Sequence, residues 1–140
     1  MNARKFASIG AIVLGVLLIV GGVGTWTVVR STLADQRITT PEDACLSERA
    51  VTGPFTAYCQ AEVIEKHTLS STGGKTYAEL DREDPARATA MNSSFLQASL
   101  FTSILAFGVS AMAIGIGVLF VLIGLGIRDV SGHMQPADAP

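Results

Sequence analysis

The two cysteines, Cys45 and Cys59, are the residues with the most distinctive chemistry in the sequence. A disulfide between them would close a loop of about 15 residues and would stabilise a small domain by roughly 3 kcal/mol in the chain-entropy model. Their spacing is not that of a redox-active C-x-x-C motif. We therefore expect a structural disulfide, and two free buried thiols are the alternative.

Two other segments carry residue types that can bind ligands. Residues 73–76, Gly-Gly-Lys-Thr, look like the end of a phosphate-binding loop, but the leading glycine is replaced by Leu69 and no strand precedes it. This segment is interpreted as a turn that leads into a helix. The acidic run at residues 79–84 is interpreted as a solvated helix start and not as a site for a divalent cation.

The cysteines and residues 73–84 lie between two long stretches without ionisable side chains, residues 6–29 and 88–127. A bilayer core needs about 20 apolar residues of helix, so both stretches are long enough to span it. The first is too long for the apolar core of a cleaved signal peptide and has no A-x-A site, so an uncleaved anchor is expected. Forty helical residues would reach about 60 Å, so the second span begins at about Leu100 or Leu105 and its outer turns form a stalk.

The predicted fold is an all-α membrane protein: a two-helix transmembrane hairpin with a small, mostly helical, disulfide-stapled extracytoplasmic domain. Its parts are a cytoplasmic N-terminus (1–5), a first transmembrane helix (6–29), the extracytoplasmic domain with the outer stalk of the second helix (30–99), a second transmembrane helix (100–127) and a cytoplasmic disordered tail (128–140). Arg4, Lys5 and Arg128 flank the spans, and positive charge near spans marks the cytoplasmic side. A multi-pass plasma-membrane protein with both termini in the cytoplasm is therefore expected.

The middle segment is expected to contain short helices. Thr40 and Pro41 resemble a helix start, which predicts a short helix through about Ala50 that carries Cys45. Gly53 and Pro54 would end it, and a second helix carrying Cys59 would follow. Asp84 and Pro85 predict the N-cap and first residue of the third. The segment from residue 30 to residue 87 has seven basic and ten acidic residues, and this negative balance does not suggest nucleic-acid binding.

Small residues recur every seven positions in both spans and predict close helix packing. They are Ser8, Gly15, Gly22, Ser103, Ser110, Gly117 and Gly124. An intramolecular hairpin is the main interpretation, and the alternative is that glycine is simply common in membrane helices. Ala7, Ala11 and Gly15 form a second face with room for a partner or a second copy.

Neither span carries an ionisable residue, which argues against a pump or a secondary transporter. A passive oligomeric pore stays open, although no polar stripe beyond serine and threonine supports it. His67 and His133 lie on opposite sides of the membrane in the predicted topology, so they cannot share a metal ion. We expect no metal and no cofactor.

The whole chain resembles a family of small two-span membrane proteins from actinobacteria, including mycobacteria and streptomycetes, whose function is not established. The resemblance is concentrated in GPFTAYCQAEVI (residues 53–64) and TGGKTYAELDREDPARATAMNSSFLQASLFTSILAFGV (residues 72–109). Members often carry the label aromatic ring-opening dioxygenase, but such enzymes need iron held by histidines and a carboxylate, which this chain does not offer. The resemblance implies a plasma-membrane location in a thick-walled bacterium with the disulfide domain outside, and it implies no catalytic residues.

These features favour association over catalysis, because no nucleophile and base lie side by side in the sequence. We expect a non-enzymatic membrane protein of the cell envelope that acts as an accessory or stabilising subunit of another membrane protein, or as a small homo-oligomer. The alternative is an extracytoplasmic module that binds a lipid, a wall fragment or an ion. A possible cleft for such a ligand, or else the core of the small domain, would be lined by Phe55, Tyr58, Tyr77, Met91 and Phe95.

Overall fold

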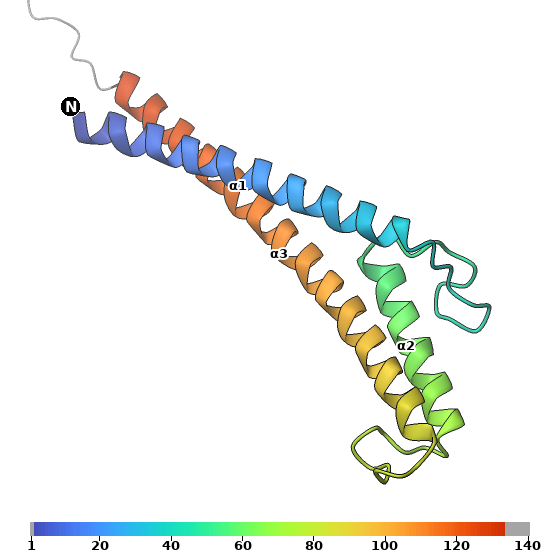
Figure 1. Ribbon diagram of the computed structural model, residues 1–140. Coiled ribbons are helices and arrows are strands. Elements are labelled where there is room, and N and C mark those ends of the chain that lie inside the picture. Colours follow the sequence, from blue (N-terminus) through green and yellow to red (C-terminus); the bar gives the residue numbers. More distant parts are fainter. Residues whose placement is uncertain (1, 134–140) are drawn as a thin grey trace, which may run out of the picture. The chain divides into compact units, whose positions relative to one another are not determined.

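Three helices make up the regular structure of the computed structural model, which describes residues 2–133 (Figure 1). They are α1 (Asn2–Asp35), α2 (Pro54–Ser71) and α3 (Ala86–His133). Within this range there is no strand, and Thr39 and Ala50 form an isolated antiparallel bridge. Both α1 and α3 are long and apolar enough to cross a membrane. The all-helical class with two candidate spans is thus confirmed.

The chain divides into two compact units, which we describe separately. Of the described residues, 2–26 and 109–133 belong to the first, and residues 27–108 belong to the second. In the first unit, α1 and α3 run antiparallel with their small residues in contact. Lipid supplies no hydrophobic force between helices, so close packing over small side chains is what can hold such a pair together.

In the second unit, α2 packs against the first half of α3. Thr68 of α2 donates a hydrogen bond of 2.6 Å to the Ser93 hydroxyl of α3. The ring of Tyr58 meets that of Phe101 edge to face, with centroids 6.4 Å apart. The core beneath these contacts consists of small and aliphatic side chains with one aromatic ring: Leu33, Val51, Ala57, Cys59, Ala61, Val63, Leu80, Ala90, Leu100 and Phe107.

The ends of α2 follow from local chemistry. Pro54 occupies its first position, where the missing N–H of proline is not needed. At the other end, Gly74 donates its backbone N–H to the Leu69 carbonyl at 2.7 Å, and both Gly73 and Gly74 have positive φ. This is a helix-terminating Schellman-type turn that requires glycine. Residues 73–76 therefore end a helix, and the expected helix directly after them does not form, because residues 72–85 are turns and bends.

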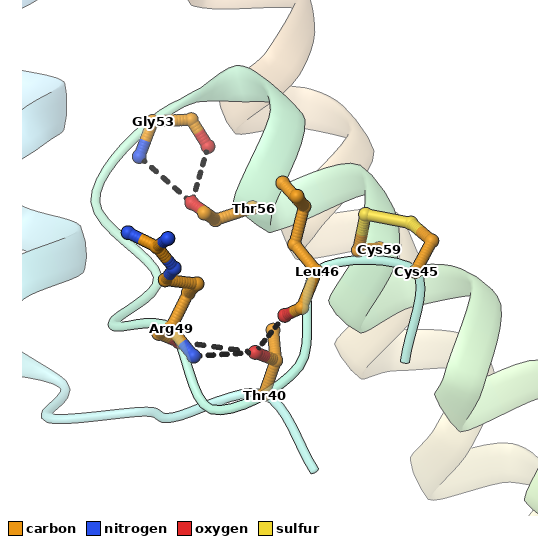
Figure 2. The surroundings of a disulfide bond; sticks show 7 residues. All are labelled: Thr40, Cys45, Leu46, Arg49, Gly53, Thr56 and Cys59. Carbon is orange, nitrogen blue, oxygen red and sulfur yellow. Dashed lines mark hydrogen bonds between the residues drawn. A yellow bond between two sulfur atoms is a disulfide. The ribbon is translucent and has the colours of Figure 1, made fainter. Parts of the chain in front are cut away.

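The predicted helix over residues 40–50 is wrong. This segment is a loop closed on itself by the buried Thr40, whose hydroxyl donates to the Leu46 carbonyl and accepts the Arg49 N–H at 2.9 Å (Figure 2). The Thr40 N–H also donates to the Arg49 carbonyl at 2.9 Å. Glu48 has a left-handed φ of 52°, which a continuous helix does not allow. Side-chain hydrogen bonds to the backbone have replaced helical ones.

The long helices also end elsewhere than expected. α1 continues to Asp35, six residues beyond the predicted end of the first span. α3 starts at Ala86, whose N–H donates to the Asp84 carboxylate at 2.8 Å, so Asp84 acts as the cap and Pro85 precedes the helix. Residues 128–133 are helical and not part of a disordered tail. The remainder of that predicted tail, residues 134–140, lies outside the described residues.

Candidate functional site

Small residues bring the backbones of α1 and α3 together inside the first unit. A Cβ atom added at Gly15 would lie 2.6 Å from the Gly117 carbonyl oxygen, and one added at Gly117 would lie 2.6 Å from the Gly15 carbonyl oxygen. Real Cβ atoms essentially never approach so closely. At Gly15 and Gly117 the two helices are therefore so close that neither helix can accommodate a side chain.

The same contact repeats one heptad away on each side. A Cβ atom at Gly22 would lie 2.8 Å from the Ser110 carbonyl oxygen, and one at Gly124 would lie 2.9 Å from the Ser8 carbonyl oxygen. The buried Ser8 hydroxyl donates to the Gly124 carbonyl at 2.7 Å, so this polar group is satisfied within the helix pair. Six of the seven predicted packing residues thus lie in one antiparallel contact.

Ser103, the seventh, behaves differently. It lies in the second unit, is half-buried, and donates its hydroxyl to the Ser99 carbonyl of its own helix at 3.1 Å. It lines a pocket of about 180 Å³, which we call the interhelical pocket. The lining residues of this pocket are Val28, Val29 and Thr32 of α1 with Thr102, Ser103 and Ala106 of α3.

A second set of glycines is open. Added Cβ atoms would meet nothing within 4 Å at Gly10, Gly21, Gly24, Gly108, Gly115 and Gly126. In α1 the two exposed leucines, Leu14 and Leu17, stand between Gly10 and Gly21, and Gly24 follows. The successive intervals are four and three residues, so these five residues share the helix face opposite Gly15. We call these surfaces the open glycine faces.

The sequence pattern predicts a free surface at Ala7, Ala11 and Gly15 and not at the open glycine faces. Gly15 is buried in the hairpin, so that surface is not available as predicted. The sequence does contain a pattern for these faces, a second sevenfold repeat offset from that of Ser8, Gly15 and Gly22. Gly10 and Gly24 are two heptads apart, and so are Leu14 and Val28.

The disulfide between Cys45 and Cys59 is present, with Cα atoms 5.3 Å apart (Figure 2). Cys59 is buried on α2, and Cys45 is exposed on the loop closed by Thr40. The predicted pairing is confirmed, although Cys45 does not lie on a helix. The disulfide therefore fixes an irregular loop to the side of α2.

A cluster of charged groups holds the same loop to α2. The Asp43 carboxylate accepts a hydrogen bond from Lys66 Nζ at 3.0 Å, and His67 Nε2 lies 2.9 Å from the same oxygen. The hydrogen bond from Lys66, followed by that from His67, lowers the pKa of Asp43 below its usual value. A pocket of about 240 Å³ adjoins this cluster and is lined by Asp43, Ala44, Cys45, Cys59, Glu62, Val63 and Lys66.

The five residues expected to line a cleft or to form the core are all exposed: Phe55, Tyr58, Tyr77, Met91 and Phe95. The interpretation that they form the domain core is therefore wrong. Phe55 is 79% exposed and Phe95 is 66% exposed, while Tyr77 lies beneath the Arg87 guanidinium at 4.2 Å. Both pockets described above are lined by other residues.

Within residues 2–133, no group of three or more histidine, cysteine or acidic side chains is arranged to hold a metal ion. Comparisons with protein-family models, curated proteins and solved structures find no match to this chain.

Proposed function

We propose that this chain is a non-enzymatic integral membrane protein of the cell envelope that acts by association, as an accessory or stabilising subunit or as a small homo-oligomer. The observation that carries the proposal is the pair of open glycine faces. The hairpin uses one heptad of small residues for its own packing and leaves another heptad unused on each helix.

The physical reason lies in how helices bind one another in lipid. Glycine lowers helix propensity by about 1 kcal/mol relative to alanine, and an open glycine offers no side chain for contact with lipid. A second helix packed on that face gains close backbone approach and van der Waals contact. Exposed leucines beside the open glycines, Leu14 and Leu17 on α1 and Leu119 on α3, supply the side chains for such an interface.

The proposed position in the bilayer follows from charge and from the interhelical pocket. The uncharged part of α1 ends at Val29, which lines this pocket together with Thr102 and Ser103 of α3. We therefore place the lipid boundary of α3 at Thr102 and Ser103. From there to Ile127 the helix rises about 38 Å, close to the roughly 36 Å from Phe6 to Val29.

The proposed orientation has residues 4–5 and Arg128 in the cytoplasm and the disulfide domain outside. It is supported by the positive charge of these flanks and by the disulfide, because such bonds persist in oxidising compartments. Membership of the actinobacterial family named above is part of the same proposal.

The experiment compares leucine substitutions at open and closed glycines. The tagged full chain is purified in mild detergent from its native membrane, and co-purifying proteins and its own oligomers are quantified by mass spectrometry. Gly21→Leu and Gly115→Leu should lower the recovered complex by about tenfold for each 1.4 kcal/mol of lost packing energy. Insertion and the disulfide should be retained, because an added Cβ at either glycine meets no atom of the chain within 4 Å.

Val16→Phe serves as the matched control, because it enlarges an exposed residue that lies outside both glycine faces of α1. It should leave association unchanged. If both open-face variants associate as the wild type does, the open glycines contact only lipid and the proposal fails.

The alternative of an extracytoplasmic binding module is supported by the pocket beside the disulfide, which combines Asp43, Glu62 and Lys66 with a volume of about 240 Å³. Recovery of the protein as a monomer without partners, together with loss of binding to wall fragments in a Glu62→Gln variant, would favour that function instead.

A further inference from the structure

The exposed face of α2 changes from aromatic to charged within one helical turn. Phe55 and Tyr58 are exposed there, and we call these two residues the aromatic face. Glu62 and Glu65 follow on the same side of α2 at helical spacing and are also exposed. No side chain in residues 50–61 is acidic or basic. Apolar surface is unfavourable in water and charge is unfavourable in lipid, so the two halves of this side of α2 suit different surroundings.

The register of α2 on α3 shows what lies beside the aromatic face. Thr68 of α2 bonds to Ser93 of α3, and nearer the start of α2 the Tyr58 ring meets that of Phe101. The two helices are therefore antiparallel within the second unit (Figure 1). Phe55, one turn before Tyr58, accordingly lies alongside the part of α3 that follows Phe101.

That part of α3 belongs to the candidate span. Phe101 directly precedes the proposed lipid boundary at residues 102–103, and Leu105, one turn later, is exposed. The aromatic face is thus continuous with apolar α3 surface that enters lipid in the proposed topology. Tyrosine, with an apolar ring and a polar hydroxyl, favours the headgroup level of a bilayer, whereas phenylalanine has no group that needs water. Tyr58 at the boundary and Phe55 beyond it have the matching order.

The start of α2 pairs backbone polar groups internally. The Thr56 hydroxyl accepts the backbone N–H groups of Thr52 and Gly53, both at 3.2 Å, and donates to the Gly53 carbonyl at 3.0 Å (Figure 2). Pro54 has no N–H to satisfy. Unpaired backbone groups are costly in lipid, so a helix start of this kind is suited to contact with a bilayer.

We infer that the aromatic face of α2 is immersed in the outer interface of the bilayer, with the Tyr58 ring at headgroup level and the Phe55 ring among the upper acyl chains. The charged second half of α2 stays in water. The stapled domain thus binds the membrane surface itself and is not only anchored by the spans. This inference rests on the proposed insertion of α3, but it does not depend on association with another protein.

Quenching of tryptophan fluorescence by brominated lipids tests the inference. The sequence contains one tryptophan, Trp26, so a Trp26→Phe background allows a single tryptophan to be introduced by Phe55→Trp. The full chain is reconstituted in phosphatidylcholine vesicles whose acyl chains carry bromine either near the headgroup or near the chain end. Phe55→Trp should lose most of its emission to bromine near the headgroup and less to bromine near the chain end. Because Phe55 is exposed, the larger ring displaces no packed side chain.

Ser70→Trp and Ile116→Trp, each in the same background, are the controls. Ser70 is exposed near the far end of α2, and a tryptophan there should keep the emission that it has in vesicles without bromine. Ile116 is exposed near the middle of the proposed second span, and a tryptophan there should be quenched by bromine near the chain end.

The two controls separate failure of the inference from failure of insertion. If Ile116→Trp is quenched and Phe55→Trp behaves as Ser70→Trp does, the span is inserted but the aromatic face lies in water or against protein, and the inference is overturned. If Ile116→Trp is not quenched either, α3 does not enter the bilayer, and the proposed function fails together with the inference.

Discussion

Thr40 shows how a single hydroxyl group determines the course of the stapled loop. In the sequence it reads as a helix cap, since it precedes Pro41 and two acidic residues. In the structure its side chain is 2% exposed and binds Leu46 and Arg49 of the same loop. A threonine hydroxyl can cap a helix or bond to the backbone of a loop with similar geometry. The residues that decide between these two roles, Leu46 and Arg49, lie six and nine positions after Thr40.

Asp43 fixes this loop to α2 in a manner that depends on pH. Hydrogen bonds from Lys66 and His67 lower the pKa of its carboxyl group below the usual value of 3.8. A lowered folded-state pKa means that the contact stabilises the loop above about pH 4 and loses this effect as the pH falls through the folded-state pKa. Amide hydrogen exchange in residues 41–50, corrected for intrinsic rates, should accelerate between pH 5 and pH 3.

The Asp43→Asn variant should exchange rapidly at both pH values, because its amide cannot form the ion pair with Lys66. Glu42→Gln is the control and should keep the pH dependence of the wild type. Identical exchange at pH 5 and pH 3 in the wild-type protein would show that the Asp43 cluster does not hold the loop.

At the scale of the element, α3 serves two environments along one continuous helix. Its first half packs on α2 through Ser93 and Phe101, and its second half packs on α1 through Gly117 and Gly124. Polar and aromatic side chains hold the first contact, and close backbone approach characterises the second. The change in composition along α3 reflects this change of partner.

Gly117→Leu tests the backbone contact. Its Cβ atom would lie 2.6 Å from a carbonyl oxygen of α1, which cannot move away as a flexible side chain could. We expect a loss of roughly 1–3 kcal/mol in the free energy of unfolding, which is typical of overpacked sites. The measurement is unfolding of the full chain in mixed micelles, followed by circular dichroism. Gly115→Leu, two residues away and open, should cost less than half as much, and equal losses would argue against the close helix contact.

The helix pair was more predictable from the sequence than the loop, for a physical reason. Uncharged stretches identify candidate spans by length alone, and a sevenfold repeat of small residues identifies a packing face without knowledge of its partner. The fold of residues 36–53 depends instead on pairings such as Thr40 with Arg49 and Ile38 with Val51, which no local periodicity encodes. The open glycine faces also follow a sevenfold spacing, but Gly15 and Gly22 form a more obvious sevenfold repeat in the same helix.

At the scale of the whole molecule, the proposed topology rests on two features. Arg4, Lys5 and Arg128 flank the spans away from the middle segment, and positive flanks favour the cytoplasm. The disulfide lies within the middle segment, and disulfides persist in oxidising compartments. We therefore propose that residues 36–85 face an oxidising compartment outside the plasma membrane. The native cysteines can report on this arrangement directly.

Intact cells are treated with a membrane-impermeant phosphine reductant and then with an impermeant maleimide. Cys45, which is exposed, should be labelled after reduction and not without it, because the reductant and the maleimide reach it from outside in the proposed topology. An Ala3→Cys substitution in a chain without the native cysteines should be labelled only after permeabilisation. If the native pair is labelled only in lysed cells and Ala3→Cys in intact ones, the orientation is the reverse of that proposed, and the stapled domain cannot meet partners or ligands outside the cell.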